Sequence, residues 1–123
     1  EPEEVAAVRA MRRRELFRLS VANLIGHIDI EQVGQGLSEL NDVTIQAALD
    51  TAIAKVMAER GGEPPTRIAV IAMGRLGGYE CSYGSDADVM FVHDPVPGAD
   101  EREAARRVKE APRRLSRGLH RPT

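Results

Sequence analysis

The chain has 123 residues, a net charge of −2, 42% apolar residues and one cysteine. This length suits one small domain or part of a larger protein, and the near-neutral charge indicates binding to neither nucleic acid nor membranes. One cysteine excludes an internal disulfide and a zinc site built from several cysteines. No apolar run approaches the ~18 residues of a membrane span, and no basic-then-apolar leader opens the chain, so we expect a soluble, cytoplasmic protein.

Residues 3–25 are predicted to form the first helix, because apolar residues recur there at helical spacing. Arginines crowd its remaining surface, between Arg9 and Arg14. These arginines could form a nucleic-acid patch, but the glutamates that flank them favour a solvated helix face. Gly26 is expected to end the helix, and His27 is expected to be a loop residue.

A second helix is predicted to begin at Asp29, its N-cap, and to run to about Arg60. Its apolar stripe consists of Val33, Leu37, Leu40, Ile45, Leu49, Ile53, Val56 and Met57. The first half also holds the poor helix formers Gly34, Gly36 and Asn41, so we expect a weak first half or a break near Asn41. Residues 44–60 are predicted to be firmly helical, with glycines at 61 and 62 ending the helix and prolines at 64 and 65 forming a rigid link.

Most of the candidate functional residues lie between Arg67 and Asp94. An apolar run over residues 68–73 leads into glycines at positions 74, 77 and 78, and a second apolar run covers residues 89–92. The residues just before that second run include Gly84, Ser85, Asp86 and Asp88. The pattern predicts a strand, a loop of the size that binds phosphate, and a second strand.

The two aspartates are the principal candidates for catalysis. Side chains two residues apart in a strand lie on one face, about 6.6–6.8 Å apart along the chain, so Asp86 and Asp88 should project together. Two adjacent carboxylates repel unless a positive charge lies between them. Mg²⁺ prefers such hard oxygen ligands and completes its shell with water and substrate phosphates. We therefore predict that both aspartates bind Mg²⁺ and act in catalysis; the alternative is two solvated acids at a strand end.

The glycine-rich turn is the candidate phosphate site, because a turn without side chains can bring backbone N–H groups to phosphate oxygens. The predicted nucleotide-binding residues are Gly74, Arg75, Gly77, Gly78, Gly84 and Ser85. Arg75 can offer phosphate a planar pair of donors, or it can be a surface residue of the turn. Ser85 can cap its turn or contact a phosphate. Glu80 is expected to hold the loop and Cys81 to fill the core.

Two motifs here resemble a known superfamily. Met73-Gly74-Arg75 and Ser85-Asp86-Ala87-Asp88 resemble the signature of nucleotidyltransferases with a DNA polymerase beta type of palm. More narrowly, the run from Gly74 to Glu80, followed by the run from Tyr83 to Val92, resembles glutamine-synthetase adenylyltransferase. Cys81 stands where that family usually has Leu. Arg75 departs from the wider superfamily but fits the narrower family.

The resemblance implies an enzyme of nitrogen regulation that transfers AMP from ATP to a tyrosine of glutamine synthetase, with Mg²⁺ as cofactor. The tyrosine hydroxyl attacks the α-phosphorus and pyrophosphate leaves. Glutamine synthetase and a nitrogen-regulatory signalling protein are the implied partners. The family also has a sister domain that removes AMP by phosphorolysis, and Tyr83-Gly84-Ser85-Asp86 resembles the adding domain more. A non-catalytic fragment that binds nucleotide or a partner is the alternative from another class.

We expect an α/β (α+β) fold with three segments: a helical lead-in over 1–66, a partial polymerase-beta-like nucleotidyltransferase mixed sheet over 67–110, and a basic tail over 111–123. The two strands should pair, and two strands alone are marginally stable. The tail could be a basic arm for nucleic acid, but a disordered, solvated end is favoured. Because it does not resemble the family's continuation, a truncated or frame-shifted end is a further hypothesis. No later strand offers the third carboxylate that the superfamily uses, so we expect this chain alone to be weak or inactive.

Overall fold

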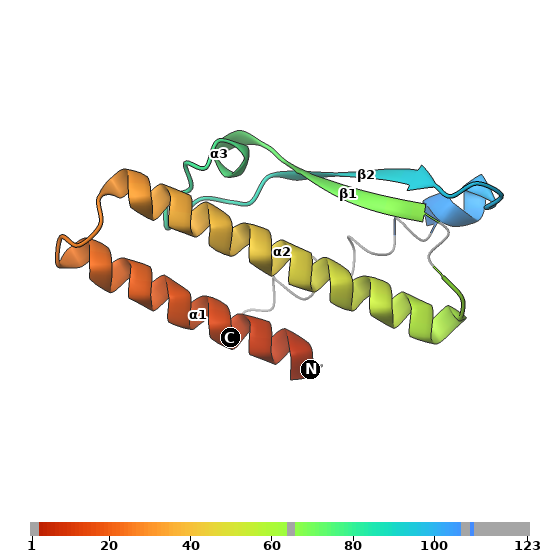
Figure 1. The fold of residues 1–123 in the computed structure, drawn as a ribbon, viewed down its shortest axis with the longest axis horizontal. Helices are drawn as coiled ribbons and strands as arrows, with labels where there is room; N and C mark the ends of the chain where they lie inside the picture. Colours follow the sequence, from red (N-terminus) through yellow and green to blue (C-terminus); the bar gives the residue numbers. More distant parts are fainter. Residues whose placement is uncertain (1–2, 64–65, 107–108, 110–123) are drawn as a thin grey trace. The chain divides into compact units, whose positions relative to one another are not determined.

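The structure, a computed structural model, describes residues 3–63, 66–106 and 109. Its elements in chain order are α1 (Glu3–Leu24), α2 (Ile30–Arg60), β1 (Thr66–Ala72), α3 (Gly74–Gly77) and β2 (Val89–Pro95) (Figure 1). Residues 101–106 are also helical. Long helices followed by strands confirm the predicted mixed fold with a helical lead-in. The predicted proline link and the basic tail lie outside the described residues.

The chain divides into two compact units. Of the described residues, those up to Gln46 and Ile71–Met90 make up the first unit, and those between Ala47 and Val70 and from Phe91 onward make up the second. Helix α2 and both strands therefore contribute residues to each unit. The predicted segment boundaries at residues 66 and 110 stay predictions.

In the first unit, α1 packs antiparallel to the beginning of α2 (Figure 1). A Cβ atom placed on Gly36 would lie 2.8 Å from Cδ2 of Leu19, so the missing side chain allows the two helices to approach closely. Arg12 of α1 donates from Nη1 to Oδ1 of Asn41 at 2.7 Å. The turn between the helices contains Gly26, as predicted, two residues after α1 ends at Leu24.

Helix α2 begins with the predicted N-cap. The N–H of Gln32 donates to Oδ1 of Asp29 at 2.8 Å, and the N–H of Asp29 donates to Oε1 of Gln32 at 3.0 Å. This reciprocal pair is a capping box, which gives acceptors to two N–H groups at the helix start. At its other end α2 stops at Arg60, and Gly61 follows with φ +70°.

The predicted break near Asn41 is wrong, because α2 is continuous from Ile30 to Arg60. Asn41 is nearly buried, and its side chain bonds outside its own helix. Helices in proteins are stabilised mainly by tertiary packing, so contacts of this kind outweigh the low helix propensity of asparagine.

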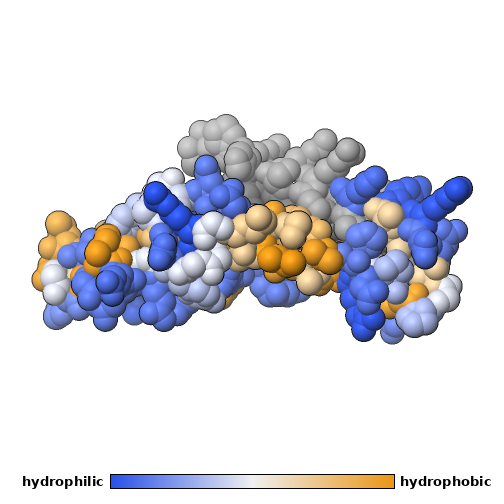
Figure 2. All heavy atoms as spheres, turned by 90° about the horizontal axis from the view of Figure 1, so that it is seen from above, coloured by the Kyte–Doolittle hydropathy of each residue, from blue (hydrophilic) through white to orange (hydrophobic). Residues whose placement is uncertain are grey.

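The two strands pair with each other, as predicted. The N–H of Met73, just after β1, donates to the carbonyl of Asp88 at 2.9 Å, and Arg67, near the start of β1, forms an ion pair with Asp94. The start of β1 therefore lies beside the end of β2, so the strands are antiparallel. Residues of β1 alternate between more and less buried positions. Figure 2 shows groups of apolar side chains on the face that it presents. Ile71 of β1 and Met90 of β2 are exposed apolar residues of the first unit.

Each unit has its own buried residues. The core of the first unit consists of Val33, Leu37, Leu76 and Cys81, with Leu16, Leu19, Ile28, Ile45, Ala72 and Val89 packed against it. The second unit buries Leu49, Ala52, Val56, Thr66 and Ala104. Cys81 is thus the small buried filler that was predicted. Among the described helices, none combines the length and the apolar character that crossing a membrane requires.

Candidate functional site

The predicted glycine turn is a single helical turn, α3, which follows β1 directly. Its N-cap, Met73, provides no side-chain cap, and Gly74 has φ +54°, a conformation that glycine adopts without strain. The N–H groups of Gly77 and Gly78 donate to the carbonyls of Met73 and Gly74, so they close the turn itself. A Cβ atom on Gly77 would lie 2.6 Å from the carbonyl oxygen of Ala72. Gly77 therefore has a steric role, and its assignment to nucleotide binding stays a prediction.

The end of α3 forms a Schellman motif. The N–H of Tyr79 donates to the carbonyl of Leu76 at 3.2 Å, and that of Glu80 donates to the carbonyl of Arg75 at 2.8 Å. Tyr79 takes the left-handed position with φ +58°, where glycine is the usual residue. Its hydroxyl donates to Oδ2 of Asp42 on α2 at 3.1 Å. This hydrogen bond, followed by the negative charge of Asp42, raises the pKa of Tyr79.

A second turn, over Ser82–Ser85, follows immediately. The N–H of Ser85 donates to the carbonyl of Ser82 at 3.0 Å, and the N–H of Ser82 donates to Oγ of Ser85 at 2.8 Å. The two hydroxyls lie 2.9 Å apart, and Nη1 of Arg75 lies 3.5 Å from Oγ of Ser82. Ser85 was predicted to cap its turn or to contact a phosphate, and in the structure it caps the turn. A Cβ atom on Gly84 would meet open space.

The two aspartates lie after this turn and before β2, which begins at Val89. The expectation that both belong to the strand is therefore corrected: strand pairing reaches the chain only at Asp88, whose carbonyl accepts the N–H of Met73. Both side chains are exposed. Oδ2 of Asp88 lies 3.4 Å from the position that a Cβ atom on Gly74 would take. The fold thus brings one predicted carboxylate against the predicted glycine turn, fourteen positions earlier in the chain.

The metal-binding capacity of this site is limited in the part of the chain that the structure describes. No group of three or more His, Cys, Asp or Glu side chains is arranged there to hold a metal ion. Asp94, the next acid after Asp88, is paired with Arg67. Two exposed aspartates offer the oxygen ligands that Mg²⁺ prefers, and this cation commonly takes one or two carboxylates from the protein.

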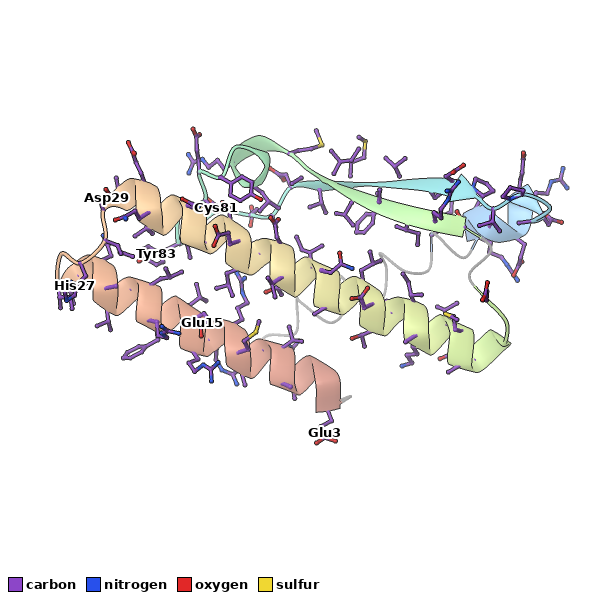
Figure 3. The ribbon with its side chains drawn as sticks, in the orientation of Figure 1. Glu3, Glu15, His27, Asp29, Cys81 and Tyr83 are labelled. Carbon is purple, nitrogen blue, oxygen red and sulfur yellow. The ribbon has the colours of Figure 1, made fainter. Side chains whose placement is uncertain are left out.

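Sequence reasoning missed three polar residues of α2 that contact the loop between the glycine turn and the aspartates: Ser38, Asn41 and Asp42. The N–H of Cys81 donates to Oγ of Ser38 at 3.3 Å, and Nδ2 of Asn41 donates to Sγ of Cys81 at 3.7 Å. Figure 3 shows Cys81 beside the first half of α2. The available signal was the run of glycines and short polar residues on a helix that otherwise has a clear apolar stripe.

Comparison with known proteins finds matches within one family of adenylyltransferases. The family model described as glutamate-ammonia ligase adenylyltransferase matches residues 1–121. A bifunctional glutamine synthetase adenylyltransferase/adenylyl-removing enzyme of Nocardia farcinica is 44% identical over 119 residues, which cover 97% of this chain and 12% of that protein. Proteins with the same name from Mycobacterium avium and Mycolicibacterium smegmatis are 47% and 48% identical over 105 and 102 residues, each covering 83% of this chain and 10% of the relative.

No solved structure matches the chain. The chain spans only about a tenth of the length of these curated relatives, while the family model extends over nearly all of its residues. The chain therefore belongs to the glutamate-ammonia ligase adenylyltransferase family.

Proposed function

We propose that this chain carries the metal- and nucleotide-binding part of an enzyme that transfers AMP from ATP to a tyrosine of glutamine synthetase, in the regulation of nitrogen metabolism. The observation that carries the proposal is the approach of the Asp88 carboxylate to Gly74, within the two motifs on which the family resemblance rests. The names of the relatives supply the target, glutamine synthetase, and the transferred adenylyl group. The cytoplasm is the proposed location, and a nitrogen-regulatory signalling protein is the proposed second partner.

Asp86 and Asp88 would hold Mg²⁺, because they are exposed carboxylates on either side of one small residue, Ala87. When bound, Mg²⁺ would neutralise charge on the phosphates of ATP. Arg75 is exposed on α3 and would donate to phosphate oxygens through its planar guanidinium group. Gly74 would leave room for phosphate because a side chain there would lie in contact with the Asp88 carboxylate.

Several residues of the predicted nucleotide site act differently in this proposal. Gly77 and Gly78 maintain the shape of the turn, since their N–H groups bond within it. Ser85 and Gly84 form the turn that leads to Asp86. They would influence nucleotide binding through the position of the acidic segment. We also propose that this chain alone is weak or inactive as a catalyst, because the described residues provide two carboxylates and no cluster of three.

The sister activity, phosphate-driven removal of AMP from the same partner, is the second candidate, because the relatives' names include an adenylyl-removing activity. The two activities are distinguished by assaying both directions on a full-length protein that contains this segment. If Asp86→Asn abolishes AMP incorporation into glutamine synthetase, this segment belongs to the adding domain. Loss of phosphate-dependent AMP release alone supports the removing domain.

The proposal is tested by titrating this chain with Mg²⁺ and ATP by calorimetry. Asp86→Asn and Asp88→Asn should each weaken Mg²⁺-dependent ATP binding by about tenfold or more, because each removes a charge-assisted ligand. Asp94→Asn is the matched control: it removes an exposed aspartate paired with Arg67 and should leave binding unchanged. Binding that survives both substitutions, or that needs no Mg²⁺, would favour a non-catalytic fragment that binds nucleotide or a partner by other means.

A further inference from the structure

The loop that joins the glycine turn to the aspartates is held from one side by α2. Residues 79–81 make three side-chain contacts with this helix: Tyr79 with Asp42, the N–H of Cys81 with Ser38, and Sγ of Cys81 with Asn41. The backbone of the loop also packs directly on the helix, since a Cβ atom on Gly34 would lie 3.4 Å from the carbonyl oxygens of Tyr79 and Cys81.

The buried members of this contact leave the loop few alternatives. Ser38 is fully buried and Cys81 is 3% exposed. Oγ of Ser38 accepts the N–H of Cys81 while its own proton goes to the carbonyl of Gly34 at 2.8 Å. A buried N–H that lost this acceptor would remain unpaired, which is costly. The Cys81 backbone is therefore held at one position on α2.

Asn41 extends the same contact to α1. Its carboxamide accepts from Arg12 through Oδ1 and donates to Cys81 through Nδ2, so one side chain connects the first helix to the loop. The donors and acceptors of both groups are matched: guanidinium only donates, and a carboxamide can accept and donate at once.

The position of Cys81 is passed to the aspartates over a short, bonded path. Ser82 follows Cys81 directly, and the three contacts between Ser82 and Ser85 set the turn that ends one residue before Asp86. On the other side, the carbonyl of Asp88 is held by the N–H of Met73. The segment with both aspartates is thus fixed at two ends, one of which depends on α2.

We propose that Ser38, Asn41 and Asp42 are positioning residues, which hold the acidic segment in the geometry that binds Mg²⁺ and ATP. This proposal depends on the proposed function of Asp86 and Asp88. In this proposal the helical lead-in supports the site through α2, which holds the loop but contributes no ligand itself. Functional sites require their ligands to be held by neighbouring groups, and small displacements weaken binding strongly.

The test compares two buried hydroxyls of α2. Ser38→Ala removes the acceptor of Cys81, whereas Thr44→Val removes a hydroxyl that donates to the carbonyl of Leu40 in the same helix. Both residues are buried in the first unit. We expect Ser38→Ala to weaken binding of Mg²⁺ and ATP about tenfold and to speed amide exchange from Cys81 to Asp88. Thr44→Val should change neither the binding nor the amide exchange, even if it lowers the melting temperature as much as Ser38→Ala does.

A milder variant keeps the test informative if Ser38→Ala unfolds the chain. Tyr79→Phe removes the exposed contact with Asp42 and should weaken binding about two- to threefold without a marked loss of stability. Wild-type affinity in Ser38→Ala, or in Tyr79→Phe where Ser38→Ala is unfolded, would overturn the proposal and leave the proposed function intact. Failure of the unsubstituted chain to bind Mg²⁺ and ATP would overturn both.

Discussion

The two halves of α2 stabilise the molecule in different ways. Residues 30–46 belong to the first unit and bury polar side chains, namely Ser38, Asn41 and Thr44, beside Val33 and Leu37. Residues 47–60 belong to the second unit, and among their described side chains the buried ones are apolar: Leu49, Ala52 and Val56. The first half of α2, which has the lower helix propensity, is therefore the half that forms hydrogen bonds with the candidate site.

The difference has a physical basis. Apolar burial is favourable but non-directional, so it tolerates small shifts of the packed residues. A buried polar group must meet its partner at hydrogen-bond distance, and this requirement selects one arrangement. The first half of α2 can thus hold the loop at a defined position, while the second half contributes packing. Four predictions test this distinction and the geometry of the loop that the first half holds, and they are ordered by the size of the expected effect.

The largest effects are expected from the core leucines of the two halves. Leu37→Ala and Leu49→Ala should each lower the free energy of unfolding by about 2–5 kcal/mol, because both side chains are 4% exposed and each truncation leaves a cavity. Denaturant unfolding measures the loss. Amide exchange over residues 79–88 should accelerate only in Leu37→Ala when both variants are folded. Equal acceleration in both variants would remove the distinction between the halves.

The tight packing of the glycine turn can be probed with two alanine substitutions. Gly77→Ala should cost about 1–3 kcal/mol, because its Cβ atom would overlap the carbonyl oxygen of Ala72, a backbone atom that cannot rotate away. Gly84→Ala is the control within the same loop, and its Cβ atom would meet open space. Thermal unfolding should separate the two variants. A Gly77→Ala protein as stable as Gly84→Ala would contradict the close approach.

Smaller and similar losses are expected at the two ends of α2. Asp29→Ala removes half of the capping box and should cost about 1 kcal/mol. Gly61→Ala places a side chain at φ +70° and should cost about 1–2 kcal/mol. Circular dichroism during thermal unfolding measures both. A loss at Asp29 far larger than at Gly61 would mean that the start of the helix also supports the loop.

The smallest effect concerns the pH dependence of Tyr79. Its hydrogen bond to Asp42 raises the pKa of Tyr79, so the folded state binds this proton more tightly than the unfolded state. The associated stability is present below the ordinary tyrosine pKa of about 10 and is lost as the pH rises through the folded value. In a Tyr83→Phe background, absorbance titration of tyrosinate should show the pKa of Tyr79 falling when Asp42 is replaced by Ala. An unchanged titration would contradict the contact.

Much of the local structure was predictable from the sequence. The Asp29 cap, the end of α2 before the glycine pair, the pairing of β1 with β2 and the burial of Cys81 are all confirmed. Each of these depends on neighbours in the chain or on a simple apolar pattern, which the residue types reveal directly. The family followed from a second kind of local signal, the run of glycines and aspartates, and the family model matches residues 1–121.

Contacts between distant residues were decided only by the tertiary structure. Propensity predicted a weak first half of α2 or a break near Asn41, yet this residue joins Arg12 to Cys81 across separations of 29 and 40 positions. Alternation predicted that Asp86 lies in a strand, yet the bonded Ser82–Ser85 turn delays β2 until Val89. A helix or strand propensity reflects only the local conformational preference of a residue and contains no information about its long-range partners. Wherever burial supplies such partners, the hydrogen bonds they form outweigh local preference and determine where the site residues lie.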